Sequence, residues 1–171
     1  MIEEKAFAQL VERRGNMVYK LAFVYMRSEF DAEDVYQNVF ERFLKYEPSF
    51  ENLEHEKAWF IVATVNVCKS MLSSSWKRHT MTLDDTQWDR VLSESSRAKV
   101  TQEDSKLIGA LLQLPSQYRV VLQLFYYEDY SVREIAKLLQ IKEGTVTTQL
   151  SRARKKMKKI LEKGGQGKYG R

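Results

Sequence analysis

The sequence predicts an all-α protein with two small helical domains joined by a flexible linker. Apolar residues recur at helical spacing along almost the whole chain. Turn residues are rare, because the 171 residues include only seven glycines and two prolines, and four of the glycines lie in residues 164–171. A β-rich or α/β domain of this length would need many more turn residues. Together these observations favour helices over sheets.

The composition also excludes several classes of function. The chain has no glycine-rich motif and therefore no dinucleotide-binding or phosphate-binding loop. Its single cysteine, Cys68, rules out disulfides and cysteine-based metal sites, and we expect it to be a buried apolar residue. The longest apolar stretch, residues 58–65, is far shorter than the roughly 20 residues of a membrane span, and no signal-peptide pattern is present. We therefore expect a cytoplasmic protein, not an integral membrane protein, with no metal, cofactor or small-molecule substrate.

The first domain is expected over residues 1–79 and begins with helices at residues 3–14 and 16–28. Gly15 and Asn16 lie between them and either break or bend the chain there. The apolar residues on both sides keep a helical spacing. The pattern therefore predicts helix up to this junction and again after it.

A further helix is expected over residues 31–46, with a wide apolar stripe on one face and acidic and amide side chains on the other. Asp31 is the expected N-cap, with Asp34 at the spacing of a capping box. A loop should follow over residues 47–56, and the next helix should extend from about residue 57 to residue 76.

Residues 80–105 lose the helical period and are rich in Ser, Thr, Asp and Glu, which predicts a linker. The second domain is expected over residues 106–163, followed by a disordered glycine-rich tail over residues 164–171. Its first helix should stop at Pro115, and a helix over residues 116–127 should follow. Each domain is small enough for its core to be marginal by itself.

The end of the second domain has a helix-turn-helix pattern, which is winged-helix-like but without strands. Residues 132–139 form the first helix, with Ser131 as N-cap and Glu134 at capping-box spacing. The last helix starts near Glu143, and the turn before it carries Gln140 where glycine is usual. This position often needs a positive φ, which glutamine tolerates less well than glycine. The alternative is an ordinary helical hairpin in a bundle core.

Charge is distributed in blocks along the chain. Residues 142–171 contain ten basic and two acidic residues, whereas residues 29–56 contain nine acidic and two basic ones. A basic segment of this kind is typical of a protein that binds a polyanion such as nucleic acid, and the alternative is a solvated, lysine-rich helix end. The basic last helix favours a DNA-binding helix-turn-helix over a hairpin in a core.

Polar residues at the start of the last helix lie off its apolar stripe and can reach base edges in DNA. They are Thr145, Thr147, Thr148, Ser151 and Arg152. Basic residues that follow, Lys155 among them, lie nearer to phosphates or to solvent. Contacts to phosphates add affinity but no sequence information.

Four segments carry a resemblance to one protein family. Residues 114–122 and 130–157 resemble the −35-binding domain of extracytoplasmic-function sigma factors, the small two-domain members of the bacterial sigma-70 family. Independently, residues 31–40 resemble the polymerase-binding helix of that family, and residues 57–69 resemble its −10 helix. The matches cover nearly all of the chain except the linker and the tail.

The resemblance implies that the acidic face of the third helix docks on the clamp helices of the polymerase β′ subunit. The residues implied there are Asp31, Glu33, Asp34, Gln37 and Glu41. Without the resemblance, a solvated helix face would be the better interpretation of such a charge run. The partners implied are core RNA polymerase, including its β flap, promoter DNA and an anti-sigma factor. The chain would be a non-catalytic specificity subunit.

The loop at residues 47–56 corresponds, by the same resemblance, to a specificity loop that accepts an unstacked −10 base. Such a base needs a pocket or a stacking surface. The residues implied in −10 binding are Phe50, Asn52, Leu53, Trp59, Asn66, Lys69, Lys77 and Arg78. For Trp59, packing in the core is the stronger interpretation, because aromatic residues at helical spacing are usually buried.

The −35 contacts implied by the resemblance lie on the last helix. The implied set is Thr145, Thr147, Thr148, Ser151, Arg152 and Lys155. Thr147 and Gln149 stand where the family commonly has basic residues, and Ser70, in the −10 helix, stands where it usually has an aspartate. The −35 sequence preference is therefore expected to be unusual.

Two other classes of function explain less of the chain. A stand-alone helix-turn-helix repressor or activator accounts for the second domain, but not for the acidic helix with Gln37 or the aromatic helix after it. An enzyme would need a nucleophile–base pair, a metal cluster or a phosphate loop, and the sequence has none of these. The leading interpretation, which the resemblance implies, is a promoter-specificity subunit that acts only with core polymerase.

Overall fold

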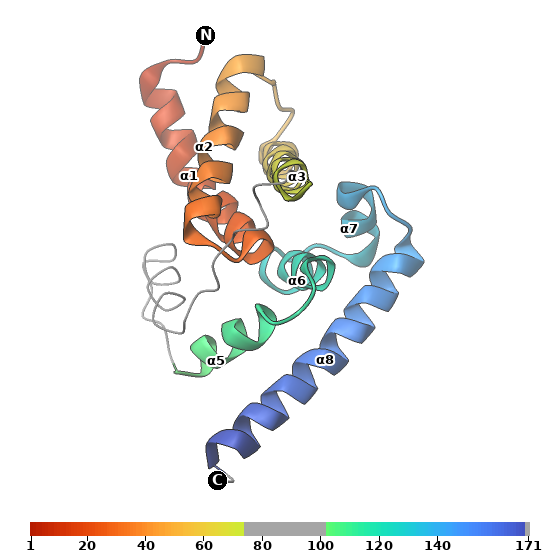
Figure 1. Cartoon of the computed structure of the whole chain (residues 1–171). Helices are drawn as coiled ribbons and strands as arrows, with labels where there is room; N and C mark the ends of the chain where they lie inside the picture. The colour runs from red at the N-terminus through yellow and green to blue at the C-terminus, as the bar shows by residue number, and fades with distance from the viewer. Residues whose placement is uncertain (74–101, 170–171) are drawn as a thin grey trace. The chain divides into compact units, whose positions relative to one another are not determined.

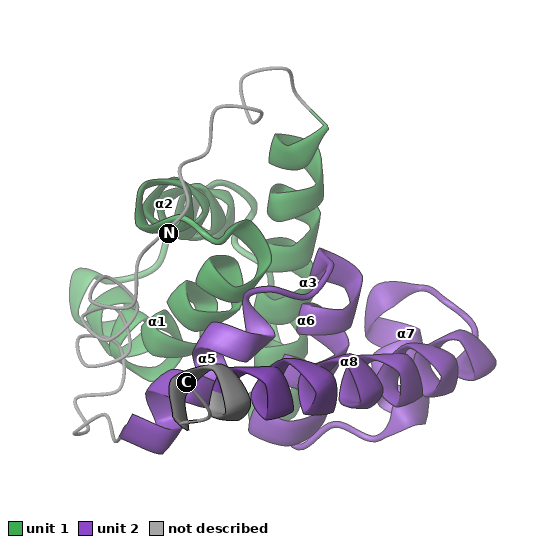
Figure 2. Ribbon diagram, turned by 60° about the horizontal axis from the view of Figure 1, so that its bottom comes forward, with its two compact units in different colours: residues 1–82 green, residues 83–171 purple. Residues whose placement is uncertain are grey.

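The computed structural model describes residues 1–73 and 102–169, and these residues form helices without strands (Figure 1). The chain divides into two compact units, residues 1–82 and 83–171 (Figure 2). The prediction of an all-α fold is confirmed. Lys77 and Arg78, which the resemblance implies in −10 binding, lie outside the described ranges, as do the predicted helix end at residue 76 and most of the expected linker.

The described part of unit 1 contains α1 (Glu4–Met26), α2 (Glu29–Tyr46) and α3 (Leu53–Leu72). The break expected as one outcome at Gly15 does not occur, because α1 is one continuous helix. Gly15 is buried, and a Cβ built on it would lie 3.0 Å from Tyr36 Oη of α2. The glycine therefore serves close packing of two helices rather than a break.

α2 starts earlier than the sequence pattern predicts. Ser28 is its N-cap, and the Asp31 backbone N–H donates to Ser28 Oγ at 3.2 Å. The assignment of Asp31 as N-cap is therefore wrong, since Asp31 lies inside the first turn. Serine is as good an N-cap as aspartate, so the sequence offers two possible N-caps three residues apart, and the helix begins after the first of them.

α3 also starts earlier than predicted, at Leu53 rather than near residue 57. Asn52 is its N-cap, and the His55 backbone N–H donates to Asn52 Oδ1 at 2.8 Å. The loop between α2 and α3 is thus shorter than expected and spans residues 47–52. Asparagine is a preferred N-cap, so the signal was present in the sequence.

Aromatic rings from all three helices form the centre of the unit 1 core. The Phe43 ring stacks on the Phe60 ring at 5.7 Å between centroids, and on the Phe7 ring at 6.2 Å. Phe40 lies against Phe60 at 5.3 Å. Burying a side chain of this size stabilises the fold by about 1.5–3 kcal/mol. The cluster joins the three helices and supports the loop that connects α2 to α3.

The described part of unit 2 contains α5 (Gln102–Leu111), α6 (Ser116–Leu122), η2 (Gln123–Tyr127), α7 (Val132–Leu139) and α8 (Glu143–Tyr169). The helix predicted over residues 116–127 is thus an α-helix that ends in a π-helical turn.

Both ends of unit 2 extend beyond the predicted bounds. The start of α5 lies inside the linker expected to reach residue 105, and α8 continues through residues 164–169, which the sequence analysis assigned to a disordered tail. Glycine costs a helix about 1 kcal/mol per residue relative to alanine but does not forbid its continuation once the helix is nucleated.

The helix-turn-helix in unit 2 is confirmed in its local detail. The Ser131 N–H donates to Glu134 Oε1 at 2.9 Å, and the Glu134 N–H donates to Ser131 Oγ at 3.1 Å. The hydrogen bond from the Ser131 backbone N–H to the Glu134 carboxylate is the largest cause that holds the pKa of Glu134 below its usual value. Gln140 takes the left-handed conformation, with φ 56° and ψ 46°, as its place in the turn predicts. Val146 of α8 is fully buried.

Candidate polymerase- and DNA-binding surfaces

α2 presents an exposed acidic and amide face. Four of the five residues implied in polymerase docking are exposed on it: Glu33, Asp34, Gln37 and Glu41. The fifth, Asp31, is only 2 % exposed, so it does not belong to this face. The physical reason is the cap at Ser28, which places Asp31 one turn before Val35 on the buried side of the helix.

The same exposed face of α2 carries apolar side chains that the sequence analysis did not select. Phe30 is 71 % exposed and lies one turn before Asp34. Leu44, one of the apolar residues of the stripe predicted over residues 31–46, is nevertheless exposed and lies three residues after Glu41. We call the set Phe30, Glu33, Asp34, Gln37, Glu41 and Leu44 the α2 face. Exposed apolar groups at both ends of a charged stripe are typical of a protein-binding surface.

The loop at residues 47–52 is held by aromatic contacts. The Phe50 ring stacks on Phe43 at 6.3 Å and meets the Trp59 ring edge-on at 6.1 Å. Trp59 in turn lies 4.9 Å from the Phe60 ring. Phe50 and Trp59 are both half-buried. They pack in the aromatic cluster and support the loop from below.

Other residues implied in −10 binding are exposed. Leu53 is 60 % exposed at the first position of α3, so it is a helical residue and not a loop residue. Asn52 is exposed, with its Oδ1 engaged as the cap of α3. Asn66 and Lys69 are exposed further along the same helix. Two of the eight implied residues, Lys77 and Arg78, lie outside the described ranges.

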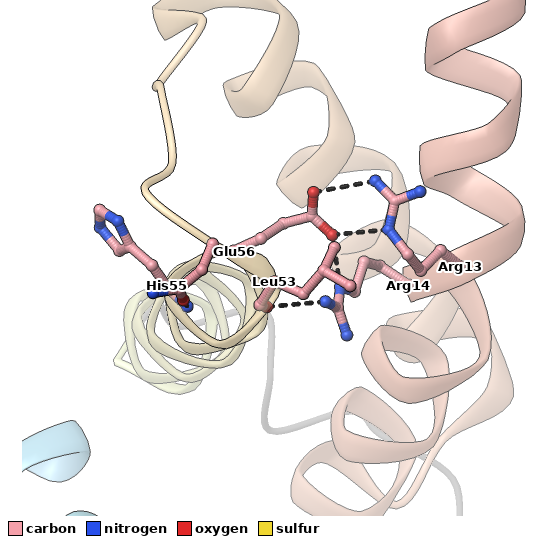
Figure 3. Close-up of polar contacts among 6 residues, drawn as sticks. Arg13, Arg14, Leu53, His55 and Glu56 are labelled. Carbon is pink, nitrogen blue, oxygen red and sulfur yellow. Dashed lines mark hydrogen bonds and ion pairs between the residues drawn. The ribbon is translucent and has the colours of Figure 1, made fainter.

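An ion-pair cluster that the sequence analysis missed joins α1 to the first turn of α3 (Figure 3). Arg13 donates through Nε to Glu56 Oε1 at 2.8 Å and through Nη2 to Oε2 at 2.9 Å. Arg14 donates through Nε to Glu56 Oε1 at 2.7 Å and through Nη2 to the Leu53 carbonyl at 2.8 Å. Charge-assisted bonds of this kind are among the strongest that side chains form.

The Glu56 carboxylate is ionised because of these partners. Its side chain is only 9 % exposed, and burial by itself raises the pKa of a carboxyl group. The hydrogen bonds from the arginines outweigh burial and lower the pKa of Glu56, with Arg13 as the largest cause. The same pair raises the pKa of Arg13.

The residues implied in −35 binding lie together on the outer side of α8. All six are exposed: Thr145, Thr147, Thr148, Ser151, Arg152 and Lys155. The apolar stripe of the helix, Val146, Leu150 and Ala153, is buried. A hollow of about 300 Å³ lies beside Arg152 and is lined by polar side chains that include Gln117 of α6.

A second concave surface of unit 2 is apolar. A groove of about 670 Å³ lies between α5, η2 and the second half of α8, and its walls include Leu107, Leu111 and Met157. Arg154 lies at its rim, where Nε donates to Tyr126 Oη at 2.6 Å. Lys158 lines the groove as well. These two basic residues therefore face the groove rather than the set that contains Arg152.

Comparison with known proteins identifies the family of this chain. A sigma-70 region 2 family model matches residues 10–78, and a sigma-70 region 4 family model matches residues 105–157. The RNA polymerase sigma factor SigV of Bacillus subtilis is 31 % identical over 146 residues, which cover 85 % of this chain and 84 % of SigV. The chain belongs to the extracytoplasmic-function sigma factors.

Two further comparisons agree with this assignment. The ECF RNA polymerase sigma factor SigE of Mycolicibacterium smegmatis is 29 % identical over 160 residues, which cover 91 % of this chain and 61 % of SigE. The sigma factor RpoE of Bartonella quintana, solved in complex with the anti-sigma factor NepR, has the same fold, with a TM-score of 0.67 at 20 % identity. The alignment covers 92 % of this sigma factor and 98 % of RpoE.

The structure of this sigma factor contains few other candidate sites. Across residues 1–73 and 102–169 no group of three or more His, Cys, Asp or Glu side chains is arranged to hold a metal ion. No helix in the part of the chain that the structure describes has the length and apolar character to cross a membrane. Cys68 is fully buried, as expected.

Proposed function

We propose that this sigma factor is a non-catalytic specificity subunit that joins core RNA polymerase and directs promoter recognition and DNA opening. One observation carries the assignment of surfaces. Four of the five residues implied in binding on α2 and all six on α8 are exposed, while the apolar stripe of the same helix builds the core of its unit. Each helix can therefore hold a partner on one side without loss of its fold. As a polymerase subunit the protein would work in the cytoplasm.

The α2 face is the proposed contact with the clamp helices of the polymerase β′ subunit. Asp34, Gln37 and Glu41 supply carboxylate and amide oxygens, which suit a basic partner surface. Phe30 and Leu44 add apolar area at the two ends of the stripe. Interfaces of this composition combine a few buried apolar anchors with charged groups that set the orientation.

The first residues of α8 are the proposed −35 readers. Arg152 lies one turn after Thr148 on the exposed side, where a guanidinium can form a bidentate contact with a guanine edge. Lys155 follows at a position suited to a phosphate. The polar hollow beside Arg152 leaves room for a base edge or an ordered water molecule.

The loop at residues 47–52 and the exposed start of α3 are the proposed −10 site. Asn52 and Leu53 are the exposed side chains of this region that the resemblance selects, while Phe50 and Trp59 form the aromatic support beneath them. A base that leaves the stack needs a rigid surface to bind to, because the free energy of its binding must offset the free energy lost on unstacking.

The apolar groove of unit 2 is the proposed site for the β flap of the polymerase. Its apolar walls and its basic rim, Arg154 and Lys158, suit an amphipathic helix that carries acidic residues. We also propose that an antagonist protein of the anti-sigma type competes for the surfaces of this sigma factor, which a pull-down from the native cytoplasm would test. The relative RpoE was solved with such a partner.

Run-off transcription tests the proposed function. Purified core polymerase is mixed with the full-length protein and the DNA upstream of the protein's own gene. We expect a discrete transcript that depends on both proteins and is lost when the −35 or the −10 segment of that DNA is scrambled. A stable dimer on palindromic DNA, with no transcript when polymerase is added, would instead support a stand-alone repressor.

A further inference from the structure

We propose that Glu56, which accepts hydrogen bonds from Arg13 and Arg14, is a positioning residue for the −10 site. It fixes the first turn of α3 and, through this turn, the end of the loop at residues 47–52. This inference rests on the proposed role of that loop, and it adds two residues of α1 that the sequence pattern did not point to. Figure 3 shows the two guanidinium groups converging on one carboxylate from the same helix.

One side chain ties the turn and the loop end together. Arg14 donates to Glu56 Oε1 through Nε and to the Leu53 carbonyl through Nη2. The Glu56 backbone N–H donates to the Asn52 carbonyl at 3.1 Å. This hydrogen bond joins the first turn of α3 to its cap residue, which is also the last residue of the loop. The planar guanidinium fixes the distance and the angle between its two acceptors, which a lysine could not do.

The second arginine fixes the carboxylate itself. Arg13 makes a bidentate contact, with Nε on Oε1 and Nη2 on Oε2, so the carboxylate plane cannot rotate. Glu56 and Arg14 are both largely buried, at 9 % and 11 % side-chain exposure. Water therefore competes little with these bonds. The position of the Glu56 carboxylate is fixed by the two arginines of α1.

Stability alone does not explain this arrangement. Two well-packed apolar residues often stabilise a protein as much as a buried ion pair, because the pair must lose its hydration. Unlike apolar packing, the hydrogen bonds of the ion pair depend on direction. They can form only in one relative position of α1 and the start of α3. The exposed Leu53 side chain and the Asn52 cap lie directly on that start. Binding sites need support of this kind to hold their contacts within about 0.5 Å.

The test uses full-length protein bound to core polymerase and the promoter found by run-off transcription. Glu56→Gln keeps the shape of the side chain and removes its charge, and Arg14→Lys keeps the charge and removes the second donor. The matched control is Glu54→Gln, an exposed acidic residue in the same turn. Three quantities are compared: affinity for core polymerase, affinity for a single-stranded −10 oligonucleotide, and the ratio of affinities for the preferred and a changed base.

We expect Glu56→Gln to weaken −10 binding about tenfold and to reduce the preference between bases, because loss of one charge-assisted bond has an effect of this order. Arg14→Lys should do the same to a smaller degree. Affinity for core polymerase should stay within twofold in both, and Glu54→Gln should behave as the unchanged protein. Amide hydrogen exchange at residues 49–55 should become faster while exchange in α2 does not.

Leu53→Ala separates failure of this inference from failure of the proposed loop function. If Leu53→Ala weakens −10 binding and Glu56→Gln does not, the loop takes the base but Glu56 does not position it. If Glu56→Gln lowers core binding and −10 binding in equal proportion and leaves base preference unchanged, Glu56 only stabilises the fold, and the inference is overturned. If neither variant affects −10 binding, the proposed role of the loop is wrong as well.

Discussion

The backbone of Gly15 in α1 packs against the phenol ring of Tyr36 in α2. A Cβ on Gly15 would lie 3.0 Å from Tyr36 Oη and 3.5 Å from Cε2. Tyr36 is itself held, with its ring 4.9 Å from that of Phe40. The absence of a side chain at position 15 therefore lets α1 and α2 approach closely, in the unit whose α2 face is proposed to bind polymerase.

This contact predicts a coupling between positions 15 and 36. Alanine favours helix by about 1 kcal/mol over glycine, so Gly15→Ala should stabilise unit 1 wherever its Cβ fits. In the native background the clash with Tyr36 Oη should cancel this gain. In the Tyr36→Phe background the gain should appear. Urea denaturation followed by Trp59 fluorescence, with Trp76 and Trp88 replaced by Phe, measures the free energy of unfolding of unit 1. Equal effects of Gly15→Ala in the native and the Tyr36→Phe backgrounds would contradict the coupling.

Reversing charge on the α2 face should remove core polymerase binding. Asp34→Lys combined with Gln37→Lys places two positive charges on the exposed stripe without touching the buried one. The matched control is Gln9→Lys with Glu12→Lys, on exposed positions of α1. We expect pull-down with core polymerase to fail for the α2 variant alone, with helix content unchanged by circular dichroism. Retention of polymerase by this variant would reject the α2 face as the docking surface.

Two residues of α8 should separate base reading from phosphate binding. A good bidentate contact to a guanine is worth about 1–3 kcal/mol, so Arg152→Ala should weaken binding most on promoters with the preferred base. Lys155→Ala should weaken binding equally on all sequences and reduce the slope of log affinity against log salt by about one. Duplex binding titrations at several salt concentrations measure both. A uniform loss in the Arg152 variant on every sequence would show that this residue does not read a base.

Unit 1 should lose stability in acid through Glu56. Its pKa is lowered in the folded state, so it contributes stability that is fully present above its unfolded value of about 4.3 and is lost as the pH falls through the lower, folded value. Glu56→Gln should cost about 1–3 kcal/mol at pH 7. The difference in the free energy of unfolding between the unchanged protein and the Glu56→Gln variant should disappear as the pH falls below about 4. Urea denaturation with Trp59 as the reporter checks this, and a gap that stays constant with pH would contradict it.

A charge placed in the apolar groove of unit 2 should weaken assembly with polymerase. Leu107 lines the groove and is partly exposed, so Leu107→Glu should be tolerated by the fold. We expect a loss of about tenfold in affinity for core polymerase, since the added carboxylate would lose its hydration in the interface and would repel the acidic side chains of the proposed partner helix. Binding of −35 duplex through α8 should be unchanged. Gln102→Glu adds the same charge at an exposed position of α5 outside the groove and should have no effect.

Local features were predictable because their causes lie within a few residues of one another. The capping box of Ser131 and Glu134, the left-handed Gln140 and the buried stripe of α8 each follow from spacing along one segment. The exposure of Thr148 and Arg152 follows from that stripe. For the same reason the two errors at helix starts were small, since in each a preferred N-cap residue, Ser28 or Asn52, lies only a few residues before the predicted start.

By itself, the sequence determined the helical class, the helix-turn-helix and the polar side of α8, because periodicity and capping are encoded locally. Only the tertiary structure decided that Phe30 and Leu44 are exposed, because this depends on how α2 is rotated against α1 and α3. It also brought Arg13 and Arg14 to Glu56, more than 40 residues away in the chain. Contacts of this kind depend on how separate helices pack, and no spacing within one segment encodes them.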